Sequence, residues 1–165
     1  MKTIGIAVVA MSALLSTSAA QADILATATN GSAQIFPAGD KFTVVLDGST
    51  AKNIIKFKTT KSGPVVITFY AECAVDGGIF DWVDVDILVD PAGAGGFAAI
   101  APTDGDNAMC TGFEGAPDGN DGRWVSAVVA GVVDLPKGNH KLKVKGDLGG
   151  AGFVRLDDIL LTVQN

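Results

Sequence analysis

Trp82, Asp84 and Asp86 form the most informative group of chemically useful side chains in this sequence. They lie in the run Asp81 to Asp90, DWVDVDILVD, in which apolar residues alternate with acidic or aromatic ones. Successive side chains of a β-strand point to opposite faces, so the run predicts one strand with two different faces. The residues predicted to enter the core are Val83, Val85, Ile87 and Val89. The indole and the two carboxylates then form a row on the solvent side.

The run Val65 to Cys73 alternates in the same way, and its apolar face leaves Tyr70 and Glu72 on the other side. If the two strands pair through the connection Ala74 to Asp81, one outer face collects two aromatic rings and three carboxylates. These five residues are Tyr70, Glu72, Trp82, Asp84 and Asp86. An aromatic ring can pack on the apolar face of a sugar while carboxylates accept hydrogen bonds from its hydroxyl groups. The pattern predicts a glycan-binding surface, and the alternatives are a plain solvated face or an interface with another protein.

Residues for catalysis are scarce. His140 is the only histidine, and no Gly-x-Ser-x-Gly motif supplies a nucleophile for it. A zinc site built from three histidines is impossible with one histidine. Glycoside hydrolysis needs only two carboxylates, for which Glu72 and Asp84 could serve, but a chain this short has little room for a deep cleft beside a core. We therefore expect a binding protein, with a small hydrolase as an alternative.

Two acidic stretches lie in the long loop predicted from Pro102 to Gly122. They are Asp104-Gly-Asp106-Asn107 and Asp118-Gly-Asn120-Asp121-Gly122. Their oxygen atoms suit calcium, but neither stretch completes an EF-hand loop, and ordinary Asp/Asn/Gly turn chemistry accounts for most of the pattern. A loop this long in a compact domain is usually functional or disordered.

The first 22 residues have the pattern of a secretory leader. Met1-Lys2 is positively charged, Ile4 to Leu15 is almost entirely apolar, and Ala20-Gln21-Ala22 fits the small-x-small cleavage rule. The apolar run is shorter than the ~20 residues that span a bilayer. We expect a mature chain of residues 23–165, one domain, that is secreted or periplasmic; a buried N-terminal helix is the alternative.

The charge balance excludes some partners. The chain has 12 Lys and Arg against 18 Asp and Glu, and loss of Lys2 with the leader leaves 11 minus 18, or −7. Nucleic acids and anionic membranes are bound by clustered basic residues, so neither is expected as a partner.

Cys73 and Cys110 are the only cysteines. In an exported chain, a single pair most often forms a disulfide. Two free thiols, or a metal site made with His140, are the competing interpretation.

The mature sequence reads as short β-type runs between turn residues, with no long amphipathic helix. This predicts an all-β, two-sheet antiparallel sandwich of about eight or nine strands with one disulfide. Trp124 is predicted as the central core tryptophan, although it could extend the aromatic face instead. The expected strands are Ile24 to Thr29, Ala33 to Phe36, Phe42 to Leu46, Ile54 to Lys58, Val65 to Cys73, Trp82 to Val89, Trp124 to Val129, Lys141 to Lys145 and Phe153 to Val163.

The C-terminal third, LPKGNHKLKV followed by FVRLDDILLTV, resembles the last two strands of jelly-roll carbohydrate-binding modules and galactose-binding-like domains. The resemblance implies a jelly-roll sandwich and a carbohydrate partner. It also implies a structural calcium ion held by Asp157 or Asp158, although the first strands offer only Asp23 as a further acid.

These observations lead to one favoured function and a rival of a different class. The favoured function is a secreted, non-catalytic β-sandwich that binds a glycan or another extracellular ligand. The rival is a structural or cell-surface assembly subunit that self-associates through an edge strand, for which the segment Ile24 to Phe36 is the candidate.

Overall fold

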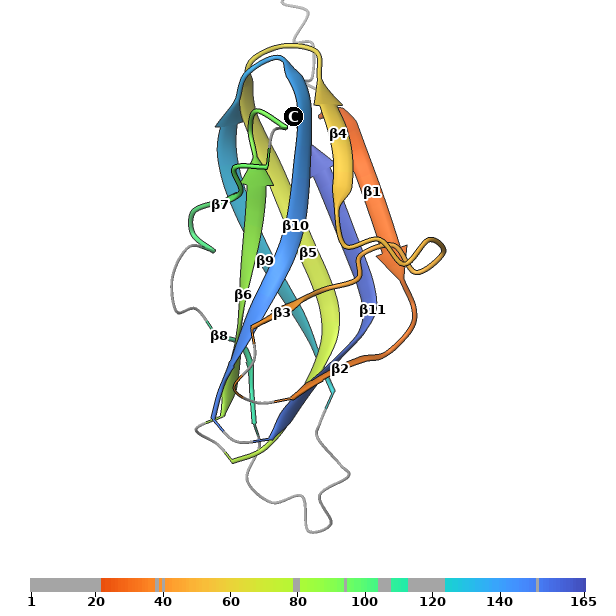
Figure 1. Cartoon of the computed structure of the whole chain (residues 1–165), viewed down its shortest axis with the longest axis vertical. Coiled ribbons are helices and arrows are strands. Elements are labelled where there is room, and N and C mark those ends of the chain that lie inside the picture. The colour runs from red at the N-terminus through yellow and green to blue at the C-terminus, as the bar shows by residue number, and fades with distance from the viewer. Residues whose placement is uncertain are drawn as a thin grey trace, which may run out of the picture.

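The computed structural model describes residues 22–37, 39, 41–78, 81–93, 95–103, 108–112, 124–150 and 152–165. Over these residues the chain forms eleven β-strands and no helix (Figure 1). No helix long and apolar enough to cross a membrane occurs in this described part. The predicted leader and most of the loop from 102 to 122 lie outside it.

Two antiparallel sheets pack face to face. The first, called sheet A, has the strand order β1-β11-β5-β9, and β2 also pairs with β11. Its strands are β1 (Ile24–Asn30), β2 (Gln34–Pro37), β5 (Gly63–Asp76), β9 (Val125–Leu135) and β11 (Phe153–Gln164). The predicted all-β, two-sheet sandwich is therefore confirmed.

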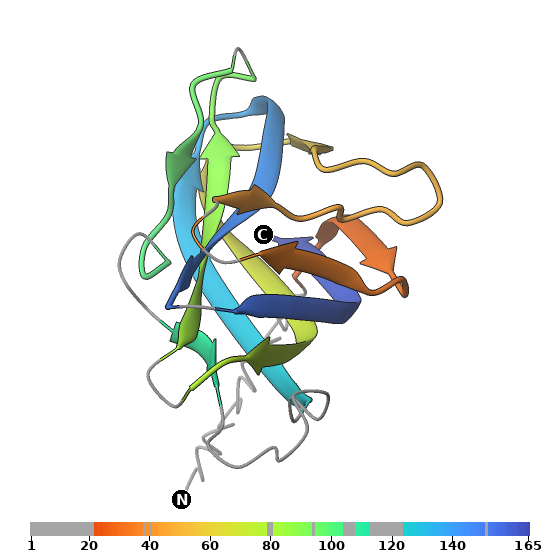
Figure 2. The ribbon, with the colours of Figure 1, turned by 60° about the horizontal axis from the view of Figure 1, so that its bottom comes forward.

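The second sheet, called sheet B, has the order β3-β10-β6-β7, and β4 and β8 pair with β10 and β6 respectively. Its strands are β3 (Phe42–Thr43), β4 (Ile55–Thr59), β6 (Trp82–Asp90), β7 (Ala98–Ala99), β8 (Ala108–Thr111) and β10 (Gly138–Gly149). Sheet B faces the viewer in Figure 1, and the rotated view sets the orange N-terminal strands apart from β6 and β8 (Figure 2). The end of the molecule with the β9–β10 turn is called the upper end, as it is drawn in Figure 1.

The core lies between the two sheets and is built from alternate residues of each long strand. Ile67 and Phe69 on β5 and Ile87 on β6 are fully buried, as are Val144 on β10 and Leu161 on β11. The four positions predicted to face inward on the strand at 82–90 are at most 1% exposed. The period-two prediction for this strand and for Val65 to Cys73 is confirmed.

Side-chain amides close one side of the sandwich, where the chain passes from sheet A to sheet B. The Asn30 amide donates to the carbonyl oxygen of Val45 at 2.8 Å. The Gln34 side chain both donates to that oxygen, at 2.9 Å, and accepts from the Val45 N–H, at 2.8 Å. Residue 45 follows the two-residue strand β3, so these amides take the place of a continued strand pairing.

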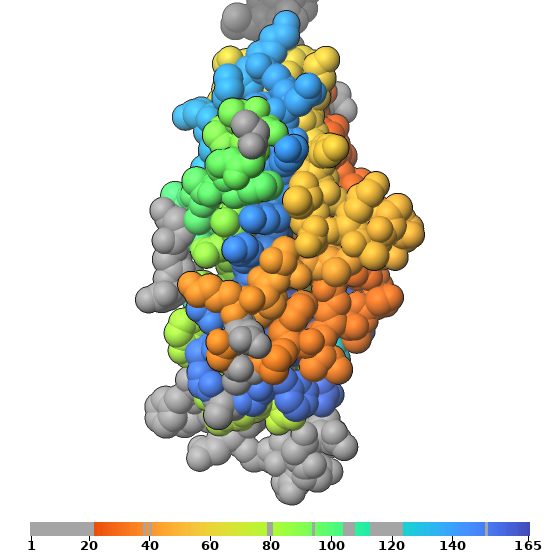
Figure 3. All heavy atoms as spheres, in the orientation of Figure 1, coloured from red at the N-terminus to blue at the C-terminus, as the bar shows by residue number. Residues whose placement is uncertain are grey.

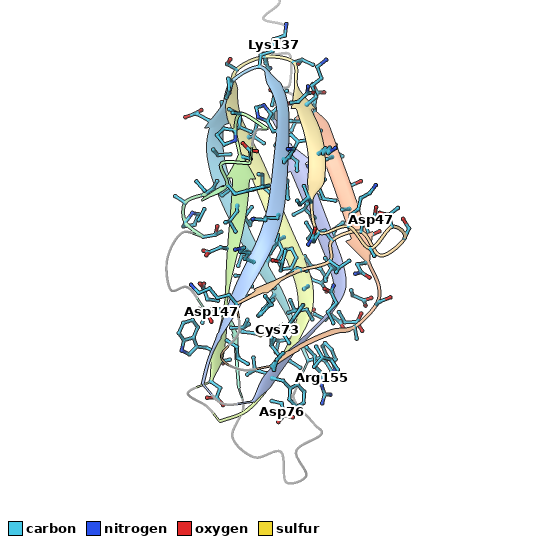
Figure 4. The ribbon with its side chains drawn as sticks, in the orientation of Figure 1. Asp47, Cys73, Asp76, Lys137, Asp147 and Arg155 are labelled. Carbon is cyan, nitrogen blue, oxygen red and sulfur yellow. A yellow bond between two sulfur atoms is a disulfide. The ribbon has the colours of Figure 1, made fainter. Side chains whose placement is uncertain are left out.

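The disulfide between Cys73 and Cys110 links the two sheets. Cys73 lies on β5 and Cys110 on β8, with 6.4 Å between their Cα atoms, and both are buried in the core. Figure 4 labels Cys73 in the lower half of the molecule. The predicted bridge is confirmed, and it is consistent with an oxidising compartment. Cys110 lies in a short strand paired with β6, whereas the sequence predicted a loop there.

At the upper end, Thr59 and His140 form a buried hydrogen-bonded pair. The Thr59 hydroxyl donates to the Pro136 carbonyl oxygen at 2.7 Å and accepts from the Gly138 N–H at 3.0 Å. The His140 ring places Nε2 2.9 Å from Thr59 Oγ1 and Nδ1 2.8 Å from the Pro91 carbonyl oxygen. The pair therefore ties β4, the β9–β10 turn and the turn after β6 together.

All nine predicted strands are present, but two features differ from expectation. Strand β7 lies where no strand was predicted and β8 lies in the predicted loop, and both were missed because each is only two to four residues long. Trp124 lies just before β9 and is 43% exposed, so its prediction as the core tryptophan is wrong.

Removal of the disulfide should destabilise the fold without changing it. The bridge spans a sequence separation of 37 residues, and closing a loop of this length is worth roughly 4 kcal/mol on the chain-entropy model. We expect C73A/C110A to unfold at lower denaturant, with a free energy of unfolding reduced by about 2–4 kcal/mol. The wild type in reductant is the control. Equal midpoints for oxidised wild type and C73A/C110A would contradict the assignment.

Loss of the Thr59 hydroxyl should also destabilise the fold. Thr59 is 1% exposed, and Thr59→Val keeps its shape while it removes the acceptor of the Gly138 N–H and the hydroxyl's contacts with His140 and the Pro136 carbonyl oxygen. We expect the free energy of unfolding to fall by about 1–3 kcal/mol. Thr60→Val, at the exposed neighbouring position, is the matched control and should change little. A Thr59→Val variant as stable as the control would show that the hydroxyl contributes nothing.

Candidate functional site

The five residues predicted to form a glycan-binding surface lie on opposite sides of the molecule. Tyr70 and Glu72 are on β5 in sheet A, whereas Trp82, Asp84 and Asp86 are on β6 in sheet B. The predicted pairing of these two strands is wrong. Strand β5 pairs with β11 and β9, and β6 pairs with β10, β7 and β8. The connection between β5 and β6 therefore crosses between sheets and does not form a hairpin.

On sheet A, Tyr70 and Glu72 face outward in a half-buried setting. The Tyr70 hydroxyl donates to Ser126 Oγ at 3.2 Å. Glu72 lies between Ser126 on β9 and Asp157 on β11 in the cross-strand register. This half of the predicted surface has one aromatic ring and two neighbouring acids.

On sheet B, Trp82 packs against the backbone of β10. It is opposite Gly149, and a Cβ atom added at Gly149 would lie 2.6 Å from the indole Cε2 atom. Glycine therefore lets the ring lie against the strand, with one side still partly exposed. The outward orientation predicted for Trp82 is confirmed.

The acids next to Trp82 have acidic and basic neighbours. Asp84 is only 8% exposed and lies opposite Asp147 on β10, while Asp86 lies opposite Lys145. Asp147 is 3.7 Å from Lys41 Nζ in an exposed ion pair. Figure 4 labels Asp147 in the lower half of the molecule, on the side of β6 and β10. The lower end of this face is thus an aromatic and acidic region.

A groove of about 670 Å³ lies at the other end of the same face. Lys56 and Lys58 from β4 line it together with Asn139 and Lys141 from β10. Ala92 and Gly93, in the turn after β6, complete the rim, and the buried Phe57 and His140 lie at its floor. Figure 3 shows the surfaces of β4, in yellow, and β10, in blue, side by side along this face.

The lysines of this groove, here called the lysine groove, are held close together by the sheet. Lys56 is directly opposite Lys141 in the β4–β10 ladder, and Lys58 is directly opposite Asn139. Directly opposed side chains have Cβ atoms about 4.5–5.5 Å apart, and like charges at that spacing destabilise a sheet. The groove therefore concentrates positive charge at a cost to the fold.

One acid lies beside the groove. Asp90 is opposite Lys141 on the β6 side and is 1% exposed. Its carboxylate accepts hydrogen bonds from the N–H groups of Ala92, at 3.2 Å, and of Gly95. These bonds hold the Asp90 carboxylate toward the turn after β6, where it offsets part of the charge of Lys141. The β4–β10 ladder itself contains no acid opposite Lys56 or Lys58.

Behind the groove, on the core side of sheet B, a hydroxyl and an imidazole are in contact, which is the arrangement of a nucleophile and its base. Thr59 and His140 are 1% and 2% exposed, however, and the hydroxyl already donates to the Pro136 carbonyl oxygen. The imidazole is oriented by the carbonyl oxygen of Pro91 and not by a carboxylate. The pair is therefore suited to holding the turns in place and not to attacking a substrate.

The predicted calcium ligands lie at a bulge of β11. The β5–β11 register shifts between Asp157 and Leu160, Asp158 has a positive φ of 45°, and its N–H donates to Asp157 Oδ1 at 2.8 Å. Within the described residues, no three Asp, Glu, His or Cys side chains gather where they could hold a metal ion. Two carboxylates supply only part of the six to eight oxygen ligands of calcium, so the structural calcium ion at Asp157 or Asp158 stays a prediction.

The acidic stretches around Asp104 and Asp118 lie outside the described residues. The sequence reasoning missed the lysine groove, although a signal for it exists. Lys56 and Lys58 alternate with buried residues, as do Lys141, Lys143 and Lys145. Alternation of this kind places each set on one face, but it does not reveal that β4 and β10 are neighbours.

No protein-family model matches the sequence, and no curated protein is similar to it. Among solved structures, the chain is similar to a carbohydrate-binding module of Cellvibrio mixtus lichenase 5A, solved with cellotriose, at 15% identity and a TM-score of 0.38. That match covers 87% of this chain and 98% of the module. The xylan-binding domain CBM22-1 of Paenibacillus barcinonensis Xyn10C matches at 14% identity and a TM-score of 0.36, over 88% and 97%.

Eiger TNF from S. frugiperda matches at 9% identity and a TM-score of 0.40, over 82% of this chain and 92% of that one. Carbohydrate-binding modules and a TNF protein are thus both among the solved structures to which the chain is similar. At TM-scores of 0.40 and below, these matches carry no argument about the ligand, which is argued from the chain itself.

Proposed function

We propose that the protein is an exported, non-catalytic β-sandwich that binds an anionic glycan in the lysine groove of sheet B. The observation that carries the proposal is the placement of Lys56 directly opposite Lys141 at the side of a groove. Like charges in this position destabilise the free protein, and a carboxylate or sulfate group between them removes the repulsion.

The dimensions and lining of the groove suit a short stretch of an acidic glycan. Its volume of about 670 Å³ falls within the range of about 300–1,000 Å³ typical of ligand pockets. Lysine ammonium groups donate to carboxylate oxygens, and the Asn139 amide can both donate to and accept from sugar hydroxyl groups. The site thus offers charge for an acidic sugar and hydrogen bonds for its neutral positions.

A polyanion without sugar hydroxyl groups fits the protein less well. The chain carries a net charge of −6, and the same face turns acidic toward its lower end, at Asp84 and Asp147. A long phosphate backbone laid along β10 would pass Lys143 and Lys145 and then meet those acids, and their charge together with the negative net charge opposes nucleic acid as the ligand. The lysine groove is better suited to a glycan in which acidic sugars lie between neutral ones than to a polymer charged along its whole length.

The region around Trp82 is a second candidate site on the same face. The indole lies against Gly149 beside Asp84 and Asp86, which retains half of the surface predicted from the sequence. A ring with neighbouring carboxylates suits the neutral part of a glycan. A polymer that runs down sheet B could contact the lysine groove with one segment and Trp82 with another.

Export follows from the predicted leader, and the fold is compatible with its removal. Strand β1 begins at Ile24, one residue after the proposed new N-terminus at Asp23. Asp23 and Asn165 exchange backbone hydrogen bonds at 3.0 and 3.2 Å, which extends the β1–β11 ladder to that residue. Cleavage after Ala22 would therefore leave every described strand intact.

A binding measurement with acidic and neutral polysaccharides tests the proposal. We expect the protein to bind a polyuronate, such as polygalacturonate, more tightly than a neutral glucan, and to lose affinity as salt is raised. K56A/K141A should weaken polyuronate binding about tenfold or more, because each lost charge-assisted hydrogen bond is worth about 1.5–3 kcal/mol. Calorimetry at two salt concentrations measures both effects.

The matched control is K52A/K61A, which removes the same charge from outside the groove and away from the path between the groove and Trp82, and it should bind like wild type. Trp82→Ala separates the two regions of sheet B. If Trp82→Ala abolishes binding while K56A/K141A does not, the glycan binds in the region around Trp82, and its assignment to the lysine groove is wrong. If neither polysaccharide binds, the glycan proposal itself fails.

A further inference from the structure

The outer face of sheet A has a different character from that of sheet B. Its middle carries apolar, hydroxyl and amide side chains, with no charged residue among the described outward positions between Glu72 and the upper end of β5. The central positions are Val66, Thr68, Tyr70, Val128, Val132 and Leu160. We call these six residues the neutral face.

The neutral face is exposed and continuous across three strands. Val128 and Val132 on β9 are 60% and 54% exposed, and Leu160 on β11 and Val66 on β5 are 41% and 40% exposed. Val66 is directly opposite Val132, and Tyr70 lies between Val128 and Leu160 in the register. Since scattered single apolar residues are normal but adjoining ones mark interaction surfaces, this face is a candidate interface.

We propose that the neutral face packs against the same face of a second copy of this chain, with the strands of the two copies running in opposite directions. Two sheets that pack face to face keep their strand directions nearly aligned and lie about 10 Å apart. A two-fold axis uses the same surface on both copies, so that if residue i of one copy contacts residue j of the other, residue j of the first also contacts residue i of the second. Such an assembly ends at a dimer and does not grow into a filament. This inference does not depend on the proposed glycan site.

The charges at the two ends of sheet A select a second copy and its direction. Glu72, Asp76, Asp157 and Asp158 lie toward the lower end, with Arg155 as the one described cation of the strands there. Figure 4 labels Asp76 and Arg155 at that end and Lys137 at the opposite, upper end.

At the upper end, Lys61 and Lys137 occupy adjoining turns, joined by a hydrogen bond from the Lys137 N–H to Ser62 Oγ at 3.0 Å, with Asp134 as the nearby acid of β9. Opposed strand directions bring the acids of one copy toward the lysines of the other. Parallel directions would stack acid on acid, which costs stability.

A contact between faces is favoured over a contact between strand edges. Strand β9 is at the edge of sheet A, but the Val132 N–H donates to the Ala101 carbonyl oxygen at 3.1 Å. This bond covers part of the edge that a second β9 would need. The outward side chains of Val128 and Val132 are left open, and they point toward a partner that approaches the face.

Sedimentation velocity over a range of protein concentrations tests the proposal. We expect the purified protein to sediment as a dimer at high concentration and to dissociate on dilution. V128K/V132K should raise the dissociation constant by at least about tenfold, because it places unpaired charges in the contact. The matched control, N53K/I54K, adds the same charge on exposed positions away from the neutral face and from the charged ends of sheet A, and it should dimerise like wild type.

Charge reversal keeps the test decisive if V128K/V132K does not fold. Asp76→Lys alone should weaken the dimer, and adding Lys137→Glu to it should restore association, because a two-fold axis at the level of Thr68 brings the lower end of β5 in one copy toward the turn after β9 in the other. A wild type that stays monomeric at every concentration overturns the proposal. So does a dimer that neither V128K/V132K nor Asp76→Lys weakens, which would point to the edge strand β1.

Discussion

Burial of alternate side chains between the two sheets is the constraint from which both outer faces follow. On β10, Leu142 and Val144 are fully buried, and the lysines at 141 and 143 are therefore turned outward. A shift of the β10 register by one residue would put those lysines into the core, at a cost no pairing there could offset. The register that buries Leu142 and Val144 therefore also sets the outward direction of the lysines on β10.

The same constraint explains why the direction of each side chain was predictable. Whether Val85 or Asp86 points inward depends only on alternation within one strand, which the sequence displays. The partner of a strand depends on contacts far away in the chain. Strand β5 pairs with β11 and β9, and the long partner of β6 is β10, so β5 and β6 do not pair with each other although they are consecutive in the chain. A short connection between β5 and β6 suggested a hairpin, and nothing local distinguishes it from a crossover.

The candidate site shows the same division between local and distant information. The sequence predicted correctly that Trp82 faces outward, yet it combined Trp82 with Tyr70, which lies on the other sheet. It did not predict the meeting of Lys56 and Lys141, because that requires β4 to lie beside β10. The prediction that Trp124 is the core tryptophan failed for another reason. A residue just before a strand is not part of the alternating pattern, so the pattern does not give the direction of its side chain, and Trp124 is 43% exposed.

The two proposed surfaces are compatible because they use opposite sides of the sandwich. A dimer formed through sheet A leaves sheet B of each copy facing away from the other. Opposed strand directions also place the two lysine grooves at opposite ends of the assembly. Avidity for a single polymer segment requires two sites that one segment can span, and this geometry does not provide them. Such a dimer would instead join two separate glycan chains, so binding in the groove and association through the neutral face would together make the protein a cross-linker.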